Sequence, residues 1–339
     1  MNSPLLSIIE KKGWCVADGA MGSNLFGRGL EAGYPPELWC LERPDEVLWL
    51  HAAFLTAGSD VILTNTFGAN ALRLKLHRSE HRVYEINVAA AKLAKRASEQ
   101  HALETGKQSY VAGSIGPSGE LFEPMGILNH EQAVDCFSVQ AEALAEGGVD
   151  LLWIETMSAN EEVAAAAEAA KKTGLPVCAT MTFDTAKRSM MGVTPSDFVR
   201  LSETLNLAVM GANCGVGPAE LMHSTLELLA AKPAIPVVVK GNCGIPEYVD
   251  GAIHYHGSPQ LMAQYALHAR DAGATVIGGC CGTTPEHIAA MVAALDESSR
   301  DIFDAAAMNE ALGIPWKHLP IISEEVQGKA GRRSRRRHG

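Results

Sequence analysis

Short runs rich in valine and isoleucine alternate eight times with longer alanine-rich segments along this chain. The short runs have the length and residue types of buried parallel strands, and the segments between them are long enough for helices. Eight such pairs predict a (β/α)8 TIM barrel rather than an open doubly wound sheet, because nothing divides the count into two halves. The predicted strands are Trp14 to Asp18, Val61 to Phe67, Tyr110 to Ile115, Leu151 to Thr156, Val177 to Phe183, Ala208 to Cys214, Val237 to Asn242 and Thr275 to Cys280.

Prolines mark the expected starts of four later helices, at a position where a helix tolerates the missing N–H group. These prolines are Pro195, Pro218, Pro259 and Pro285. The barrel is expected to occupy residues 1–298, followed by a C-terminal extension over 299–326 and a basic, disordered tail over 327–339. The tail carries five arginines, and a short terminal run of charge is typical of a solvated end.

The composition is that of an ordinary globular chain of 339 residues, with 47% hydrophobic and 20% charged residues. The net charge of -11 argues against a nucleic-acid partner. No segment has the apolar length of a membrane span, and Met1 to Gly13 lacks a signal-peptide core. We therefore predict a cytoplasmic protein with no membrane partner, and we expect a homo-oligomer.

Three cysteines end two of the predicted strands beside glycines. Cys214 ends the sixth strand, Cys280 ends the eighth, and Cys281 follows it directly. Both strands are even-numbered, and alternate strands of a barrel contribute to the same interior layer, so the three thiols are predicted to converge. Flanking glycines give the vicinal pair the backbone freedom to face one ion. Three thiolates and one open position are typical of catalytic zinc, so we predict a zinc site at the C-terminal face of the barrel.

Two other interpretations of these cysteines stay open. The vicinal pair could form a strained redox disulfide, or all three residues could be small buried hydrophobes. The metal interpretation is favoured because the other five cysteines are scattered singly, as reduced core thiols are. Those five are Cys15, Cys40, Cys136, Cys178 and Cys243.

Carboxylates also stand at predicted strand ends. Asp18 ends the first strand and Glu155 ends the fourth, at the face where barrels build their active sites. A structural role remains the alternative for each, since Asp18 could cap a turn and Glu155 could be solvated. We therefore treat both as candidate binding residues.

Six motifs stand at the ends of these predicted strands: Asp18-Gly19-Ala20-Met21-Gly22, Thr64-Asn65-Thr66-Phe67, Gly113-Ser114-Ile115-Gly116-Pro117, Glu155-Thr156, Gly211-Ala212-Asn213-Cys214 and Gly278-Gly279-Cys280-Cys281-Gly282. Together they resemble the homocysteine S-methyltransferase family, which includes the homocysteine-binding domain of cobalamin-dependent methionine synthase. The resemblance runs from about Trp14 to Met291. Three further segments, residues 120–126, 191–195 and 240–246, are most similar to bacterial betaine-homocysteine S-methyltransferases.

The resemblance implies a zinc-dependent methyl transfer to L-homocysteine that yields L-methionine. A zinc ion on the three cysteines would bind the homocysteine sulfur and deprotonate it at neutral pH. By the same resemblance, Asp18 and Glu155 would hold the homocysteine ammonium, and Asn213 would belong to the substrate site. Backbone amides of Gly19, Ala20 and Met21 would bind the carboxylate.

Glycine betaine is the methyl donor that the resemblance favours, and its demethylation gives dimethylglycine. A quaternary ammonium is recognised by aromatic faces, and Trp39 is the candidate for that role. Thr156 stands where animal betaine enzymes have a tyrosine, and no tyrosine follows Phe67, so the donor pocket is expected to differ from theirs. Companion aromatic residues are Tyr34, Phe67, Tyr248 and Tyr255.

Two alternatives to the betaine hypothesis remain. The chain could be the homocysteine module of a split cobalamin-dependent methionine synthase, with the methyl group delivered on a separate corrinoid protein. The absence of an Asp-x-His-x-x-Gly corrinoid motif here is compatible with that. The chain could also be a non-catalytic zinc-binding or redox-sensing barrel.

Overall fold

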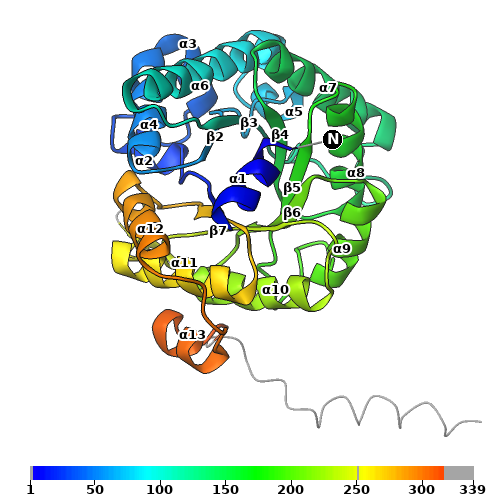
Figure 1. Ribbon diagram of the computed structural model, residues 1–339. Helices are drawn as coiled ribbons and strands as arrows, with labels where there is room; N and C mark the ends of the chain where they lie inside the picture. Colours follow the sequence, from blue (N-terminus) through cyan, green and yellow to red (C-terminus); the bar gives the residue numbers. More distant parts are fainter. Residues whose placement is uncertain (1–2, 250–251, 317–339) are drawn as a thin grey trace, which may run out of the picture.

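The computed structural model describes residues 3–249 and 252–316, and a sheet of eight parallel strands forms its centre (Figure 1). The strands are β1 (Cys15–Val16), β2 (Val61–Leu63), β3 (Tyr110–Ile115), β4 (Leu151–Met157), β5 (Val177–Met181), β6 (Val209–Cys214), β7 (Val237–Gly241) and β10 (Val276–Gly279). Their spatial order is β1-β10-β7-β6-β5-β4-β3-β2. Consecutive βα units are thus neighbours, and the last strand returns to the first.

The two ends of this order meet, so the sheet closes on itself. A parallel bridge pairs Ala17 with Val61, and the amide of Asp18 donates to the carbonyl of Val61 at 3.1 Å. The amide of Asp60 donates to the carbonyl of Val16 at 2.7 Å. The predicted (β/α)8 barrel is therefore confirmed.

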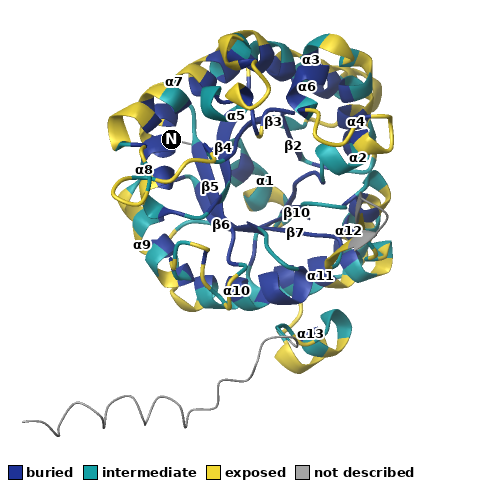
Figure 2. Cartoon of the chain, turned by 180° about the vertical axis from the view of Figure 1, so that it is seen from behind, coloured by how far each residue is buried: buried dark blue, intermediate teal, exposed yellow. Residues whose placement is uncertain are grey.

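Helices surround the barrel and turn their buried faces inward, as the burial colours in Figure 2 show. Prolines occupy the first turn of α9, α10, α11 and α12, as the sequence predicts. Within the described residues, no helix is both long and apolar enough to cross a membrane. The helices that follow the barrel strands are α4 (Pro44–Thr56), α6 (Val83–Thr105), α7 (His130–Glu146), α8 (Asn160–Lys171), α9 (Pro195–Thr204), α10 (Pro218–Ala230), α11 (Pro259–Ala272) and α12 (Pro285–Glu297). Shorter pieces are α2 (Gly22–Phe26), η1 (Pro36–Leu38), α3 (Trp39–Glu42), α5 (Ala71–Lys75) and η2 (Glu80–Arg82).

An additional helix, α1 (Pro4–Lys12), lies across one end of the barrel (Figure 1). Its Leu5 side chain is fully buried among inward-facing strand residues such as Cys15 and Trp153. These residues form one apolar cluster, whereas outward-facing strand residues pack against the helices in another. Because α1 fills the N-terminal end, the open mouth lies at the carboxyl ends of the strands.

The first two strands are shorter than the sequence predicts, because side chains replace the backbone ladder near the mouth. The Oδ2 atom of Asp18 accepts from the amide of Leu63 at 2.7 Å. Likewise, Oγ1 of Thr64 accepts from the amide of Ser114 at 2.9 Å. Hydrogen bonds from polar side chains therefore link neighbouring strands at the mouth of the barrel, where the active site is expected.

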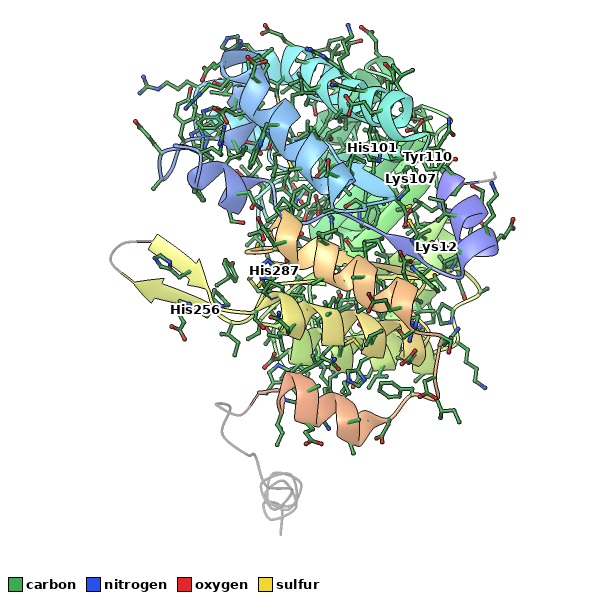
Figure 3. All side chains as sticks on the ribbon, turned by 60° about the vertical axis from the view of Figure 1, so that its left-hand side comes forward. Lys12, His101, Lys107, Tyr110, His256 and His287 are labelled. Carbon is green, nitrogen blue, oxygen red and sulfur yellow. The ribbon has the colours of Figure 1, made fainter. Side chains whose placement is uncertain are left out.

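A β-hairpin lies between β7 and α11. Strands β8 (Pro246–Val249) and β9 (Ala252–Tyr255) pair antiparallel, and the hairpin stands out from the barrel body in Figure 3. An Asp250-Gly251 pair between two short runs was the available sequence signal, since Asp-Gly favours two-residue hairpin turns. Ser258 then caps α11 through the amide of Leu261.

The C-terminal extension is described as far as Trp316. Helix α13 (Ala305–Leu312) lies outside the ring against α10 and α11 (Figure 1). His223 contacts it through Asn309, and the Trp316 ring packs edge-on against His223 at a centroid distance of 6.0 Å. The predicted tail, residues 327–339, lies outside the described residues.

Candidate active site

The thiols of Cys214, Cys280 and Cys281 come together at the mouth, where β6 and β10 end on either side of β7. Their sulfur atoms all lie within 4.8 Å of one another, and the Sγ atoms of Cys214 and Cys281 are 3.9 Å apart. A tetrahedral zinc ion with Zn–S bonds of about 2.3 Å would hold its sulfurs about 3.8 Å apart. The cluster therefore fits one zinc ion on three thiolates, with a fourth position left for a substrate atom.

Backbone contacts with the end of β7 hold the vicinal pair in place. The amide of Cys280 donates to the carbonyl of Gly241 at 2.7 Å, and the amide of Cys281 donates to Oδ1 of Asn242 at 3.1 Å. A Cβ atom on Gly279 would lie 2.2 Å from the Thr283 side chain, so this turn requires glycine. Gly279 thus permits close packing, while Gly282, with a φ angle of 76°, has the backbone freedom that the sequence predicts for the flanking glycines.

Asn213 connects the thiols to β4. Its Nδ2 atom donates to Oγ1 of Thr156 at 2.7 Å and to Sγ of Cys280 at 3.7 Å, while its Oδ1 accepts from the amide of Thr156 at 2.9 Å. Thr156 and Cys214 have φ angles of 62° and 63°, which residues with a Cβ atom rarely adopt. Such strain persists where surrounding contacts impose it and clusters at functional sites. The contacts make Asn213 an orienting residue.

The three thiols share their protons unequally. Hydrogen bonds from Cys214 and Cys280 lower the pKa of Cys281 to about 3, and the Tyr255 side chain adds a further hydrogen bond. The hydrogen bond with Cys280 raises the pKa of Cys214 far above its ordinary value. Because thiolates are the ligands of zinc, metal binding would displace the remaining protons.

Asp18 is fully buried near the thiols, and both of its oxygens have partners. Oδ1 accepts from Nζ of Lys240 at 2.9 Å, and Oδ2 accepts from the amide of Leu63. Burial raises the pKa of Asp18, and the charge of Lys240 opposes that shift. The carboxylate predicted from the sequence to hold a substrate ammonium is thus already engaged by a protein ammonium.

The carboxylate of Glu155 has fewer hydrogen-bond partners than that of Asp18. Its Oε1 accepts from Oγ of Ser114 at 2.5 Å, and within residues 3–249 and 252–316 no group donates to Oε2. Burial raises the pKa of Glu155 to about 7, and the charge of Lys240 opposes the shift. The Oε2 atom is therefore available to a cationic ligand.

The raised pKa of Glu155 predicts a pH-dependent stability difference. Its ordinary value is 4.5 and its folded value is about 7, so the folded metal-free protein binds this proton more tightly. Stability due to the group is present below pH 4.5 and is lost as pH rises to about 7, by roughly 3 kcal/mol. Urea unfolding of wild type and Glu155→Gln from pH 4.5 to 8 should show the wild type losing stability relative to the variant. A constant difference across that range would contradict the assignment.

Lys240 is the charged site residue that sequence reasoning missed. It lies on β7 in register with Asn213 and is almost completely buried. Burial alone would lower the pKa of Lys240, but the charges of Asp18 and Glu155 outweigh that effect and leave the pKa raised. The available signal was a lysine directly after the apolar run Val237-Val238-Val239. A side chain on such a strand faces either the surrounding helices or the barrel interior, and both environments are buried.

The segment predicted to bind a substrate carboxylate follows β1 directly. A Cβ atom on Gly19 would lie 2.6 Å from the carbonyl oxygen of Thr283, so the chain passes closely there. The amide of Ala20 donates to that same oxygen at 3.1 Å and is not free for a ligand. Within the described residues the amides of Gly19 and Met21 have no backbone partner, and they remain candidates.

Trp39 begins α3, which packs against α4 and α6, and only 5% of its surface is exposed. The guanidinium of Arg43 lies 4.5 Å from its ring centroid and covers one face. The role of Trp39 in donor binding stays a prediction.

Among the companion aromatic residues, Tyr255 contacts the cysteine motif and Phe67 follows β2. A Cβ atom on Gly282 would lie 2.3 Å from Cγ of Tyr255, and one on Gly116 would lie 2.7 Å from the Phe67 ring. Tyr34 is exposed, and its hydroxyl donates to Glu42. The side chain of Tyr248 lies outside the described residues.

The sequence model of homocysteine S-methyltransferase matches residues 15–295. The chain belongs to the homocysteine S-methyltransferase family. That match includes every strand of the barrel together with the three clustered thiols. Membership therefore covers both the fold and the candidate site.

Relatives of known sequence and structure agree with this family. Methionine synthase of Mycobacterium tuberculosis (strain ATCC 25618 / H37Rv) is 30% identical over 314 residues, which cover 88% of this chain and 26% of that protein. Methionine synthase of Mycobacterium leprae (strain TN) is 30% identical over 83% of this chain and 24% of its own. The chain thus spans about a quarter of the length of these relatives.

Among solved structures, the metallated form of the homocysteine methyltransferase MmuM from Escherichia coli superposes with a TM-score of 0.74 at 25% identity. The alignment covers 86% of this chain and 99% of that one. The oxidised form of the same protein gives 0.72 at 26% identity. The barrel of this chain is therefore shared with that relative over nearly the relative's whole length.

Proposed function

We propose that the chain catalyses zinc-dependent methyl transfer to the thiol of L-homocysteine, giving L-methionine. The observation that carries the proposal is the cluster of three thiols at the barrel mouth, whose sulfur spacing fits a zinc ion held by three protein ligands. When bound there, zinc supplies a Lewis acid that favours the ionised form of the homocysteine thiol. Family membership and the metallated form of the E. coli relative support the same chemistry.

The chain's own residues would bind and orient the amino acid. Glu155 provides negative charge for the ammonium, while the carboxylate of Asp18 pairs with Lys240. The amides of Gly19 and Met21 lie just after β1, where a carboxylate could approach. Asn213 holds Thr156 and Cys280 in position. The sulfur then forms its bond to the methyl carbon as the donor's bond to that carbon breaks. The bonding pair leaves with the donor, and the thiol proton passes to solvent.

For the donor, we propose glycine betaine. The trimethylammonium group loses its charge as the methyl leaves, so aromatic faces suit the site because they attract the cation without a tight ion pair. Support comes from the position of Tyr255 beside the cysteine motif and of Phe67 after β2. The methyl loss from nitrogen leaves dimethylglycine, with the electron pair on nitrogen.

Trp39→Ala should selectively raise the KM for betaine while the KM for homocysteine stays unchanged, if Trp39 helps to bind the donor. A good cation–π contact is worth about 0.5 to 2 kcal/mol, which predicts a rise of roughly 2-fold to 30-fold. Because the residue is buried, Trp39→Phe and melting curves for both variants separate donor binding from loss of packing. Equal losses for both substrates, or a change only in melting temperature, would show that Trp39 is a structural anchor.

A second donor hypothesis is a methylated corrinoid protein. It is favoured by the match to methionine synthases, of which this chain covers only about a quarter. Methionine formation should be assayed with zinc-loaded enzyme, homocysteine and a panel of betaine, sulfonium methyl donors and a methylated corrinoid protein. Betaine should give methionine. Turnover with the corrinoid protein alone would replace the betaine proposal, and no turnover with any donor would favour a non-catalytic zinc or redox barrel.

A further inference from the structure

Lys240 lies buried beside Asp18, one of the candidate substrate-binding residues. The Nζ atom of Lys240 lies 2.9 Å from Oδ1 of Asp18, and the side chains are 3% and 0% exposed. The ammonium also lies 5.5 Å from the ring centroid of Trp153, inside the barrel. A buried ion pair of this kind is costly to desolvate and is weak evidence for stability, so a functional reason for it is worth seeking.

The charges of Asp18, Glu155 and Lys240 do not cancel. Asp18 and Glu155 each bring a carboxylate and Lys240 brings one ammonium, and all three are buried. Lys240 bonds Asp18 directly, whereas Oε2 of Glu155 has no donor within the described residues. When both carboxylates are ionised, these three side chains carry two negative charges and one positive charge, and the carboxylate without a cationic partner is that of Glu155.

We propose that Lys240 is a positioning residue that neutralises Asp18, so that Glu155 alone makes the anionic contact with the substrate ammonium. Asp18 then acts on homocysteine through Lys240, because its carboxylate keeps the lysine away from Glu155. This inference rests on the proposed function. It identifies which carboxylate of that site binds the single ammonium group of the amino-acid substrate.

Loss of the Asp18 charge should therefore weaken homocysteine binding indirectly. In Asp18→Asn, the ammonium of Lys240 loses its partner and pairs with Glu155, where it competes with the substrate ammonium. The KM for homocysteine should rise at least tenfold, while the KM for the methyl donor stays within threefold. Adding Lys240→Met removes the competitor, so the double variant should recover a homocysteine KM within threefold of wild type.

The experiment compares Asp18→Asn, Lys240→Met and the double variant by steady-state kinetics and by calorimetric titration of L-homocysteine into zinc-loaded protein. Lys92→Met on the exposed face of α6 is the control, and it should not rescue Asp18→Asn. Asp18→Asn with Lys240→Gln provides a second neutral pair, for use if melting curves show that Lys240→Met destabilises the fold. A double variant that keeps the raised KM would overturn the proposal and make Asp18 a direct ligand of the ammonium.

The same measurements separate failure of this inference from failure of the proposed function. If wild type neither binds nor methylates homocysteine, the proposed function is wrong. If wild type is active and Asp18→Asn leaves the homocysteine KM unchanged, only the role of Lys240 is wrong.

Discussion

Alanine at Cys214, Cys280 or Cys281 should abolish methyl transfer and remove bound zinc while leaving the barrel folded. Each replacement leaves two thiolates, too few for the three-ligand site that activates a thiol. A metal that supplies several kcal/mol of activation accounts for a loss of at least about a thousandfold in kcat/KM. The measurement is methionine formation under saturating donor, with zinc content determined on the same samples by elemental analysis.

Cys136→Ala is the matched control, because Cys136 is a half-buried thiol on helix α7. It should keep its zinc, its activity and its melting temperature to within a few degrees. About one zinc per chain is expected in the wild type. A reduced, metal-free wild type that turns over at full rate would show that the thiols do not act through a metal.

The fold could be predicted from the sequence because each βα unit has a local signal. Prolines at the first turn of α9 to α12 mark helix starts, and valine-rich runs such as Val237 to Val239 mark buried strands. The meeting of the three thiols followed from the barrel topology, because Cys214 ends one even strand and Cys280 follows another. A local pattern and one topological rule were therefore enough to place them together.

Other parts of the site depend on contacts that no local pattern encodes. Lys240 and Asp18 are 222 positions apart in the sequence, and only the closed barrel brings them within 2.9 Å. The burial of Trp39 depends on how α3 packs between helices, so a tryptophan in a loop after the first strand gave no indication that Arg43 would cover its ring. The residue types indicated which side chains could bind a substrate, but only the tertiary packing shows which of them are already occupied by another protein group.

Glu155→Gln should raise the KM for homocysteine roughly 10-fold to 150-fold and change the KM for the donor little. The substitution keeps the shape of the side chain and its contact with Ser114 but removes the charge that Oε2 offers to the substrate ammonium. Charge-assisted hydrogen bonds contribute about 1.5 to 3 kcal/mol, which sets the expected range.

Two comparisons make the Glu155 result specific. Ser114→Ala removes the hydroxyl that orients Oε1 but keeps the charge, so its effect on the homocysteine KM should be smaller. A thiol substrate without the amino group, 4-sulfanylbutanoate, should distinguish wild type from Glu155→Gln far less than homocysteine does, because it has no ammonium to lose. If the variant discriminates equally against both thiols, Glu155 acts on the reacting sulfur rather than on the ammonium.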